Sequence, residues 1–224
     1  GISDIYASPI FKARRGSTHG YDVIDHGDVD PALGGEQGFT AFSAALRAQG
    51  MGLVLDIVPN HMGIATTDNT WWMDVLENGP SSSYAAYFDI DWRPVNPHLE
   101  NKVLLPILED LYGNVLEDGK LRLVYEDGAF FISYHDAKLP VAPQTYSTIL
   151  ERRLDPLTQK LGKDNPSVLE CQSILTANGH LPPRTDLDPE KREERHRENE
   201  IIKRRIASLY QASAEVRSAI DLAV

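Results

Sequence analysis

The chain has 224 residues, 42% of them hydrophobic, and its 22 basic and 33 acidic side chains give a formal net charge of −11 at pH 7. This size and apolar content suffice for one large globular domain or two small ones. An acidic surface repels phosphates, so neither nucleic acid nor an anionic membrane is an expected partner. The sequence shows no signal peptide and no apolar run of about 20 residues, and its single cysteine fits a reducing compartment, so we expect a cytoplasmic protein.

The first 62 residues predict one βαβ unit. Residues 2–9 form an apolar run that is typical of a strand, and residues 39–46 place apolar side chains at helical spacing. Gly50 is a typical helix-ending residue, and residues 51–58 follow at once as a run that is typical of a buried strand. A single right-handed crossover makes two such strands parallel.

Polar loops follow both predicted strands. The first loop contains Ser17-Thr-His19-Gly-Tyr21-Asp22, and the second contains Asp56-Ile-Val-Pro-Asn60-His61. Neighbouring parallel strands lie about 4.8 Å apart and send such loops to one rim of the sheet. We therefore expect four side chains to converge there, with Asp56 behind them: His19, Tyr21, Asp22 and His61.

Residues 63–145 do not continue this alternation of strand and helix, which predicts an inserted sub-domain. Two runs of β-branched and aromatic residues, 121–125 and 130–134, flank the sequence Glu126-Asp-Gly128. A tight-turn sequence between two such runs predicts a β-hairpin.

Residues 146–224 predict helices. Asn165-Pro166 is a typical helix start, and Gly179 is a typical helix end. Residues 188–205 are dense in charges of both signs, with opposite charges four residues apart, which predicts a solvated helix face. Apolar residues continue at helical spacing up to Val224, so we expect both chain ends to be internal boundaries of a longer protein.

The two strand-end motifs together resemble those of the α-amylase superfamily of glycoside hydrolases and transglycosidases. Residues 56–61 look like the superfamily's first signature, at the end of the third barrel strand, and residues 19–22 look like the loop after the second strand. The sequence Tyr84-Ala-Ala-Tyr87-Phe-Asp-Ile-Asp-Trp92 is similar to that of the maltooligosyl trehalose synthase branch.

This resemblance implies an α/β fold that is part of a TIM (β/α)8 barrel. Residues 1–62 would supply the second and third barrel strands with the helix between them. Residues 63–145 would be an inserted α+β sub-domain, and residues 146–224 a helical segment that leads back toward the barrel.

The resemblance also implies an isomerase-class activity on maltooligosaccharides. Such an enzyme converts the reducing-end α-1,4 bond of a maltodextrin into an α,α-1,1 bond by intramolecular transglycosylation. Two other interpretations stay open, namely an α-amylase-type hydrolase of α-1,4-glucans and a catalytically silent carbohydrate-binding module.

By the same resemblance, the rim residues are expected to bind the sugar. Tyr21 would form a platform under a glucose, His61 would donate to a sugar hydroxyl, and His19 and Asp22 would lie beside them. Asp56 and Asn60 would stand behind these residues and orient them. No metal and no cofactor is expected, and one of four aromatic residues in the inserted segment is expected to face sugar: Trp71, Trp72, Tyr87 and Trp92.

The catalytic carboxylates of the superfamily follow later barrel strands. The one superficial match to the nucleophile's motif, Arg184-Thr-Asp186, follows two prolines without a strand, so we interpret it as a loop. We therefore expect the nucleophile and the acid/base to lie beyond Val224, and we expect the 224-residue chain to be inactive. Uncovered strand edges would also favour its self-association.

Overall fold

Two units make up the computed structural model, which describes residues 1–224. Unit 1 is Gly1–Thr70 and unit 2 is Trp71–Val224. None of the helices combines the length and the apolar character that a membrane span requires.

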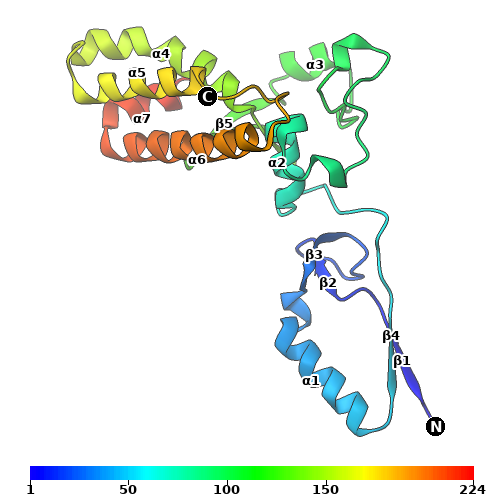
Figure 1. Ribbon diagram of the computed structural model, residues 1–224. Coiled ribbons are helices and arrows are strands. Elements are labelled where there is room, and N and C mark those ends of the chain that lie inside the picture. The colour runs from blue at the N-terminus through cyan, green and yellow to red at the C-terminus, as the bar shows by residue number, and fades with distance from the viewer. The chain divides into compact units, whose positions relative to one another are not determined.

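Unit 1 contains the predicted βαβ arrangement (Figure 1). Strands β1 (Asp4–Ala7) and β4 (Gly52–Leu55) pair in parallel, in a register that sets Ala7 beside Leu55. Helix α1 (Gly35–Ala48) connects them and buries Leu46. Gly50 follows the helix at a φ of +65°, where a glycine is favoured, and the chain turns directly into β4.

A second ribbon in unit 1 lies inside the loop that the sequence indicated after the first strand. Strand β2 (Phe11–Ala13) pairs antiparallel with β3 (Val23–Val29), with irregular register, and the 3-10 helix η1 (Pro31–Leu33) follows. This ribbon was not predicted, because β2 has three residues and β3 carries two aspartates, a histidine and a glycine instead of alternating apolar residues. Residues 14–22 are therefore the tip of a ribbon.

Unit 2 contains a three-stranded antiparallel sheet. Strands β5 (Arg122–Glu126) and β6 (Ala129–Tyr134) form the predicted hairpin, and β7 (Ala137–Pro140) adds a third strand. Asp127 and Gly128 form the two-residue turn with φ values of +45° and +87°, which is the geometry that an Asp-Gly pair favours. The hairpin prediction is confirmed, and the third strand was not predicted.

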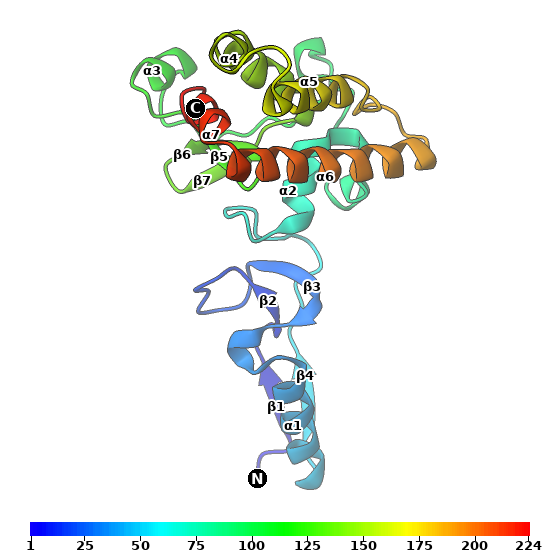
Figure 2. The same cartoon turned by 90° about the vertical axis from the view of Figure 1, so that its left-hand side faces the viewer.

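Four helices of unit 2 pack side by side (Figure 1 and Figure 2). They are α4 (Tyr146–Leu161), α5 (Pro166–Gly179), α6 (Pro189–Ala212) and α7 (Ala214–Asp221). The Asn165 side chain caps α5 by accepting from the Ser167 N–H, and this helix ends at Gly179, as predicted. Their apolar faces meet in one core with the sheet: Phe130, Tyr146, Ile149, Leu157, Val168, Ile174, Leu181, Ile202, Ile206, Leu209, Val216 and Ile220.

Short helical turns connect these parts. They are α2 (Thr70–Asn78), η2 (Gly79–Ser81), η3 (Ala85–Tyr87), η4 (Pro97–Leu99), α3 (Tyr112–Glu117) and η5 (Pro143–Thr145). Most of them begin with or contain a proline or glycine, which is typical of segments that turn often and pack as irregular structure.

The prediction of a solvated charged face on α6 is wrong at two positions. Arg195 is only 1% exposed and donates to the Pro182 carbonyl oxygen and to the Gln144 side chain. The Lys203 ammonium contacts both carboxylate oxygens of Glu77, at 2.8 and 2.9 Å. These charges are buried because each one finds a fixed partner in the elements that pack against α6.

Candidate functional site

The carboxyl ends of the two parallel strands position Asp56. Its backbone N–H donates to the Ala7 carbonyl oxygen at 2.9 Å, which extends the β1–β4 ladder by one residue. Its Oδ2 atom accepts hydrogen bonds from the hydroxyl groups of Tyr21, at 2.7 Å, and of Tyr6, at 2.8 Å. Asp56 therefore ties the ribbon tip, β1 and β4 together.

These hydrogen bonds shift three pKa values. The bonds from Tyr21 and then Tyr6 stabilise the ionised carboxylate and lower the pKa of Asp56 below its ordinary range. The same bonds raise the pKa of both phenols, because a phenolate would lose its bond and face a negative charge. At neutral pH this group is one carboxylate with two phenol donors.

His61 contacts the ribbon tip from the loop after β4. Its Nε2 atom lies 3.0 Å from the Tyr21 carbonyl oxygen. A carbonyl oxygen only accepts, so Nε2 carries the proton, and Nδ1 of the neutral ring is left as an acceptor. Tyr21 is therefore held at two points, at its hydroxyl by Asp56 and at its backbone by His61.

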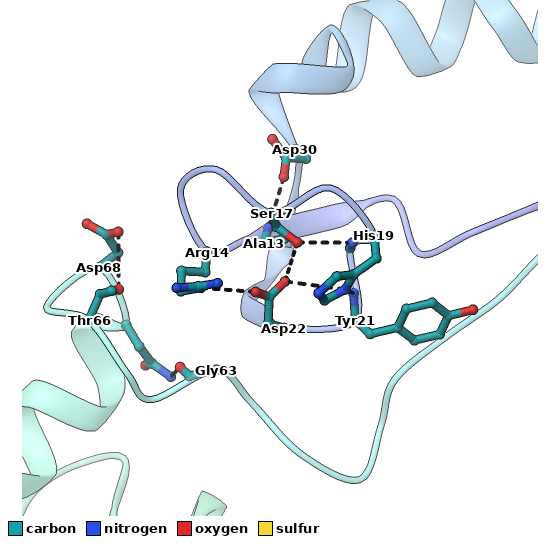
Figure 3. Close-up of polar contacts among 12 residues, drawn as sticks. Ala13, Arg14, Ser17, His19, Tyr21, Asp22, Asp30, Gly63, Thr66 and Asp68 are labelled. Carbon is teal, nitrogen blue, oxygen red and sulfur yellow. Dashed lines mark hydrogen bonds and ion pairs between the residues drawn. The ribbon is translucent and has the colours of Figure 1, made fainter. Parts of the chain in front are cut away.

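A polar network holds the other end of the tip (Figure 3). The Asp22 carboxylate accepts from the Ser17 hydroxyl and from Arg14 Nε, the latter at 3.1 Å, and lies 3.9 Å from His19 Nδ1. Burial alone would raise the pKa of Asp22, but the bonds from Ser17 and Arg14 together lower it. Asp22 is thus an ionised brace inside the tip.

The ring of Tyr21 points away from this network (Figure 3), and Tyr21 is 42% exposed. Its backbone N–H donates to His19 Nδ1 at 3.0 Å, and the two rings lie 6.0 Å apart with planes inclined by 30°. The tip therefore presents one partly stacked aromatic face to solvent.

Two glycines allow the tip to close. Gly20 has a φ of +78°, and a Cβ there would lie 2.7 Å from the Pro9 carbonyl oxygen. Gly63 donates from its N–H to the Val23 carbonyl oxygen at 2.7 Å, and a Cβ there would lie 2.8 Å from the Asp22 carbonyl oxygen. A side chain at either position would push the tip away from the strand ends.

Five of the six predicted site residues belong to this connected group: His19, Tyr21, Asp22, Asp56 and His61. Asn60 is exposed at a bend next to His61, and its side chain makes no hydrogen bond. No group of three or more acidic, histidine or cysteine side chains is arranged to hold a metal ion.

Three residues of the group were not predicted from the sequence. Tyr6 contacts Asp56 only because the parallel register brings β1 beside β4, and Arg14 and Ser17 reach Asp22 only through the unpredicted ribbon. The predicted parallel pairing of the two strands was the one sequence signal that could have indicated Tyr6, because it brings β1 beside the strand that ends at Asp56.

The motif at residues 184–186 lies in a loop, as predicted. Arg184 donates to the Asn101 carbonyl oxygen at 2.9 Å, and burial lowers its pKa. A Cβ on Gly79 would lie 2.4 Å from the guanidinium, so this arginine packs tightly against the backbone of unit 2. Its contacts are those of a structural residue.

The sequence matches one protein-family model over more than half of its length. The family model for the alpha amylase catalytic domain matches residues 1–128, more than half of the sequence. The chain belongs to the alpha-amylase family. It is accordingly a mixed α/β chain that carries part of this family's catalytic domain.

Individual members of the family are similar to this chain over part of its length. A Mycobacterium tuberculosis protein named "Putative maltooligosyl trehalose synthase" is 44% identical over 146 residues, which cover 64% of this chain and 17% of the relative. The intracellular maltogenic amylase of Bacillus subtilis is 39% identical over 95 residues, 42% of this chain and 15% of that protein.

Solved structures of related proteins are similar to the chain to a comparable degree. The maltooligosyltrehalose synthase of Arthrobacter ramosus is 43% identical and superposes with a TM-score of 0.53, over 62% of this chain and 17% of that one. Another maltooligosyl trehalose synthase is 38% identical with a TM-score of 0.57, over 62% of this chain and 18% of that one. The chain thus spans less than a fifth of the length of each of these four relatives.

Proposed function

We propose that this chain supplies the glucose-binding rim of a maltooligosyl trehalose synthase. The complete enzyme would convert the reducing-end α-1,4 bond of a maltooligosaccharide into an α,α-1,1 bond by intramolecular transglycosylation. The observation that carries the proposal is the contact of Tyr21 with Asp56 and His61 at the carboxyl ends of two parallel strands. In barrels of this type the carboxyl ends of the strands carry the chemistry.

Tyr21 provides the platform for the sugar. A flat aromatic face offers apolar contact to the C–H face of a pyranose. Asp56 holds the Tyr21 hydroxyl, and His61 and His19 contact the backbone of the same residue. Binding then costs little side-chain entropy, because the ring is already ordered.

His61 faces the sugar with Nδ1. Since Nε2 donates to the Tyr21 carbonyl oxygen, the neutral ring accepts a hydrogen bond from a glucose hydroxyl, and it donates from Nδ1 only when protonated. We expected His61 to donate to the sugar; we now propose that its neutral ring accepts instead, because its one N–H is engaged by the Tyr21 carbonyl oxygen.

Asp22 and Asp56 position other residues and do not perform the bond cleavage. A retaining mechanism needs two carboxyl groups roughly 5–5.5 Å apart, one of which is an acid with a raised pKa. The pKa of both aspartates is lowered. Arg14 and Ser17 each bind one oxygen of Asp22, and Tyr6 and Tyr21 share Oδ2 of Asp56. We therefore assign the nucleophile and the acid/base to the remainder of the enzyme and expect no turnover from these 224 residues alone.

A hydrolase of α-1,4-glucans is the second candidate, because the maltogenic amylase of B. subtilis shares 39% identity over 95 residues. The two candidates differ in their products. A trehalose-forming enzyme removes reducing ends without cutting the chain, whereas a hydrolase creates new reducing ends.

The test is an assay of the complete protein encoded by the gene with maltohexaose. We expect loss of reducing ends without chain shortening, and a reduction of kcat/KM by at least tenfold in Tyr21→Ala and His61→Ala. Asn60→Ala is the matched control, because Asn60 is exposed on the same loop without a side-chain partner. New reducing ends would establish the hydrolase instead, and no conversion at all would establish a silent binding module. An Asn60→Ala loss equal to that of His61→Ala would contradict the assigned rim.

A further inference from the structure

Adjacent aromatic residues in unit 2 separate into an inner and an outer layer. Trp72 is 6% exposed and packs against Phe88, with ring centroids 5.0 Å apart. Trp71 precedes it on α2 and instead stacks on Tyr84, at 4.9 Å with planes inclined by 13°, and contacts Tyr87 at 5.0 Å. Trp72 is buried, and the outer three rings, Trp71, Tyr84 and Tyr87, form what we call the aromatic cluster.

Tyr87 is the exposed ring of this cluster. It is 68% exposed, yet its ring is flanked by Trp71 and lies 6.5 Å from Tyr84. The backbone beneath is a tight turn, in which the Tyr87 N–H donates to the Tyr84 carbonyl oxygen at 3.0 Å and the Tyr84 N–H donates to Ser82 Oγ at 3.0 Å. The ring is therefore both accessible and fixed.

The hydroxyl groups of the cluster are unused. Neither the Tyr84 nor the Tyr87 hydroxyl makes a hydrogen bond within the chain, and neither ring has a charged group stacked on it. A surface that joins flat apolar faces with free hydroxyl groups matches a ligand that has C–H faces and hydroxyl groups on each unit, which is the chemistry of a sugar.

We propose that the aromatic cluster is a second binding site for an α-1,4-glucan chain. A glucosyl unit stacks on the exposed face of Tyr87, and the two tyrosine hydroxyl groups bond to its hydroxyls. The choice of an α-1,4-glucan rests on the proposed function of the rim, whereas the site itself rests on the geometry of the three rings.

The size of the cluster favours a sugar over a protein partner. An aromatic side chain buries about 150–250 Å² when it is fully covered, and these three rings are already partly covered by one another. A stable protein interface needs about 800 Å² on each partner. The exposed area therefore suits one or two glucosyl units and falls short of a contact between copies of the chain.

The test is a titration of the 224-residue chain with maltoheptaose, followed by tryptophan fluorescence and by calorimetry. All three tryptophans lie in unit 2, and Trp71 touches the ring that would bind, so the emission reports on this site. We expect a saturable change, weakened at least tenfold by Tyr87→Ala. Tyr112→Ala is the matched control, since Tyr112 is 64% exposed in the same unit without a ring partner, and it should bind as the unchanged chain does.

Three results would overturn the proposal. They are the absence of a saturable fluorescence change, equal affinities of Tyr87→Ala and the unchanged chain, or equal weakening by Tyr112→Ala. A change of sedimentation with Tyr87→Ala in the absence of sugar binding would identify a contact between copies instead. Tyr21→Ala, which removes the rim's platform, should leave the fluorescence response intact. The titration does not read the product of the reaction, so a hydrolase in place of a trehalose-forming enzyme would leave this result unchanged.

Discussion

Replacing Lys203 by methionine tests whether the buried ion pair with Glu77 stabilises the fold through its charges or only through the packing of the two side chains. The two side chains are 17% and 11% exposed, and methionine keeps most of the lysine volume. The substitution leaves the Glu77 carboxylate in the interior without its cation, and breaking a buried pair in this way is typically worth about 3–5 kcal/mol.

Protonation of Glu77 sets a ceiling on this loss. The ordinary pKa of this carboxyl is 4.5, so neutralising it at pH 7 spans about 2.5 pH units and costs about 3.4 kcal/mol, at about 1.36 kcal/mol per unit. At pH 5 the same cost is about 0.7 kcal/mol. Burial raises the pKa of Glu77 even with Lys203 present, so part of this cost exists before the substitution.

The sign of the pH dependence follows from the raised pKa. A carboxyl whose pKa is higher in the folded state contributes stability at low pH and loses it as pH rises through the folded pKa. In the folded variant the pKa of Glu77 should be higher still, because Lys203 no longer stabilises the carboxylate. The variant should therefore approach the unchanged chain in stability as the pH falls from 7 to 5.

Urea unfolding followed by tryptophan fluorescence measures this loss in unit 2, where all three tryptophans lie. We expect Lys203→Met to lower the free energy of unfolding by about 3 kcal/mol at pH 7 and by about 1 kcal/mol at pH 5. Lys191→Met is the matched control on the same helix: its pair with Glu194 is exposed and screened by water, so the substitution should change the free energy of unfolding far less than Lys203→Met does at pH 7. A Lys203→Met loss of equal size at both pH values would refute the charge argument.

Three further predictions concern the turn of the hairpin, the rim and the sheet of unit 1. Gly128→Ala should lower the free energy of unfolding by about 3 kcal/mol or more in the same urea assay, because its φ is +87° and the new Cβ would lie 1.9 Å from a backbone carbonyl oxygen of α6. Gly119→Ala is its control: at a φ of +67° in open space, this substitution should lower the free energy of unfolding by only about 1–2 kcal/mol. Asp56→Asn should lower the pKa of the two phenols that share its Oδ2 toward their ordinary value of 10.0, which ultraviolet titration of the phenolates measures, and unchanged titration would contradict the shared bond. The 224-residue chain should self-associate in sedimentation through the two-stranded sheet of β1 and β4, where Val54 is 51% exposed, and Val54→Lys should shift it toward monomer; a monomeric unchanged chain would contradict this.

Local signals made part of the fold predictable. The βαβ unit could be predicted from apolar periodicity and from Gly50, and the hairpin from Asp127-Gly128, because each signal acts within a few residues. The ribbon of β2 and β3 lacks such a signal, since its strands are short, polar and irregular in register. The burial of Arg195 depends on a carbonyl and an amide from other segments, which no pattern within α6 encodes.

The candidate site was predictable to a similar degree. The motifs placed Tyr21, Asp56 and His61 at the ends of parallel strands, and parallel pairing then brings them together. Whether a side chain at that rim makes a contact depends on register and on backbone closure at single residues. This is why Tyr6 was missed and why Asn60 was expected in a group that it does not contact.

The closure of the rim within a short stretch of sequence has a consequence for synthesis. Every hydrogen bond that holds Tyr21, Asp56 and His61 joins residues no later than Gly63. At typical translation rates the rest of the chain takes on the order of ten seconds more to emerge from the ribosome. A side chain introduced at Gly20 or Gly63 would therefore disturb the nascent rim before the helices of unit 2 exist.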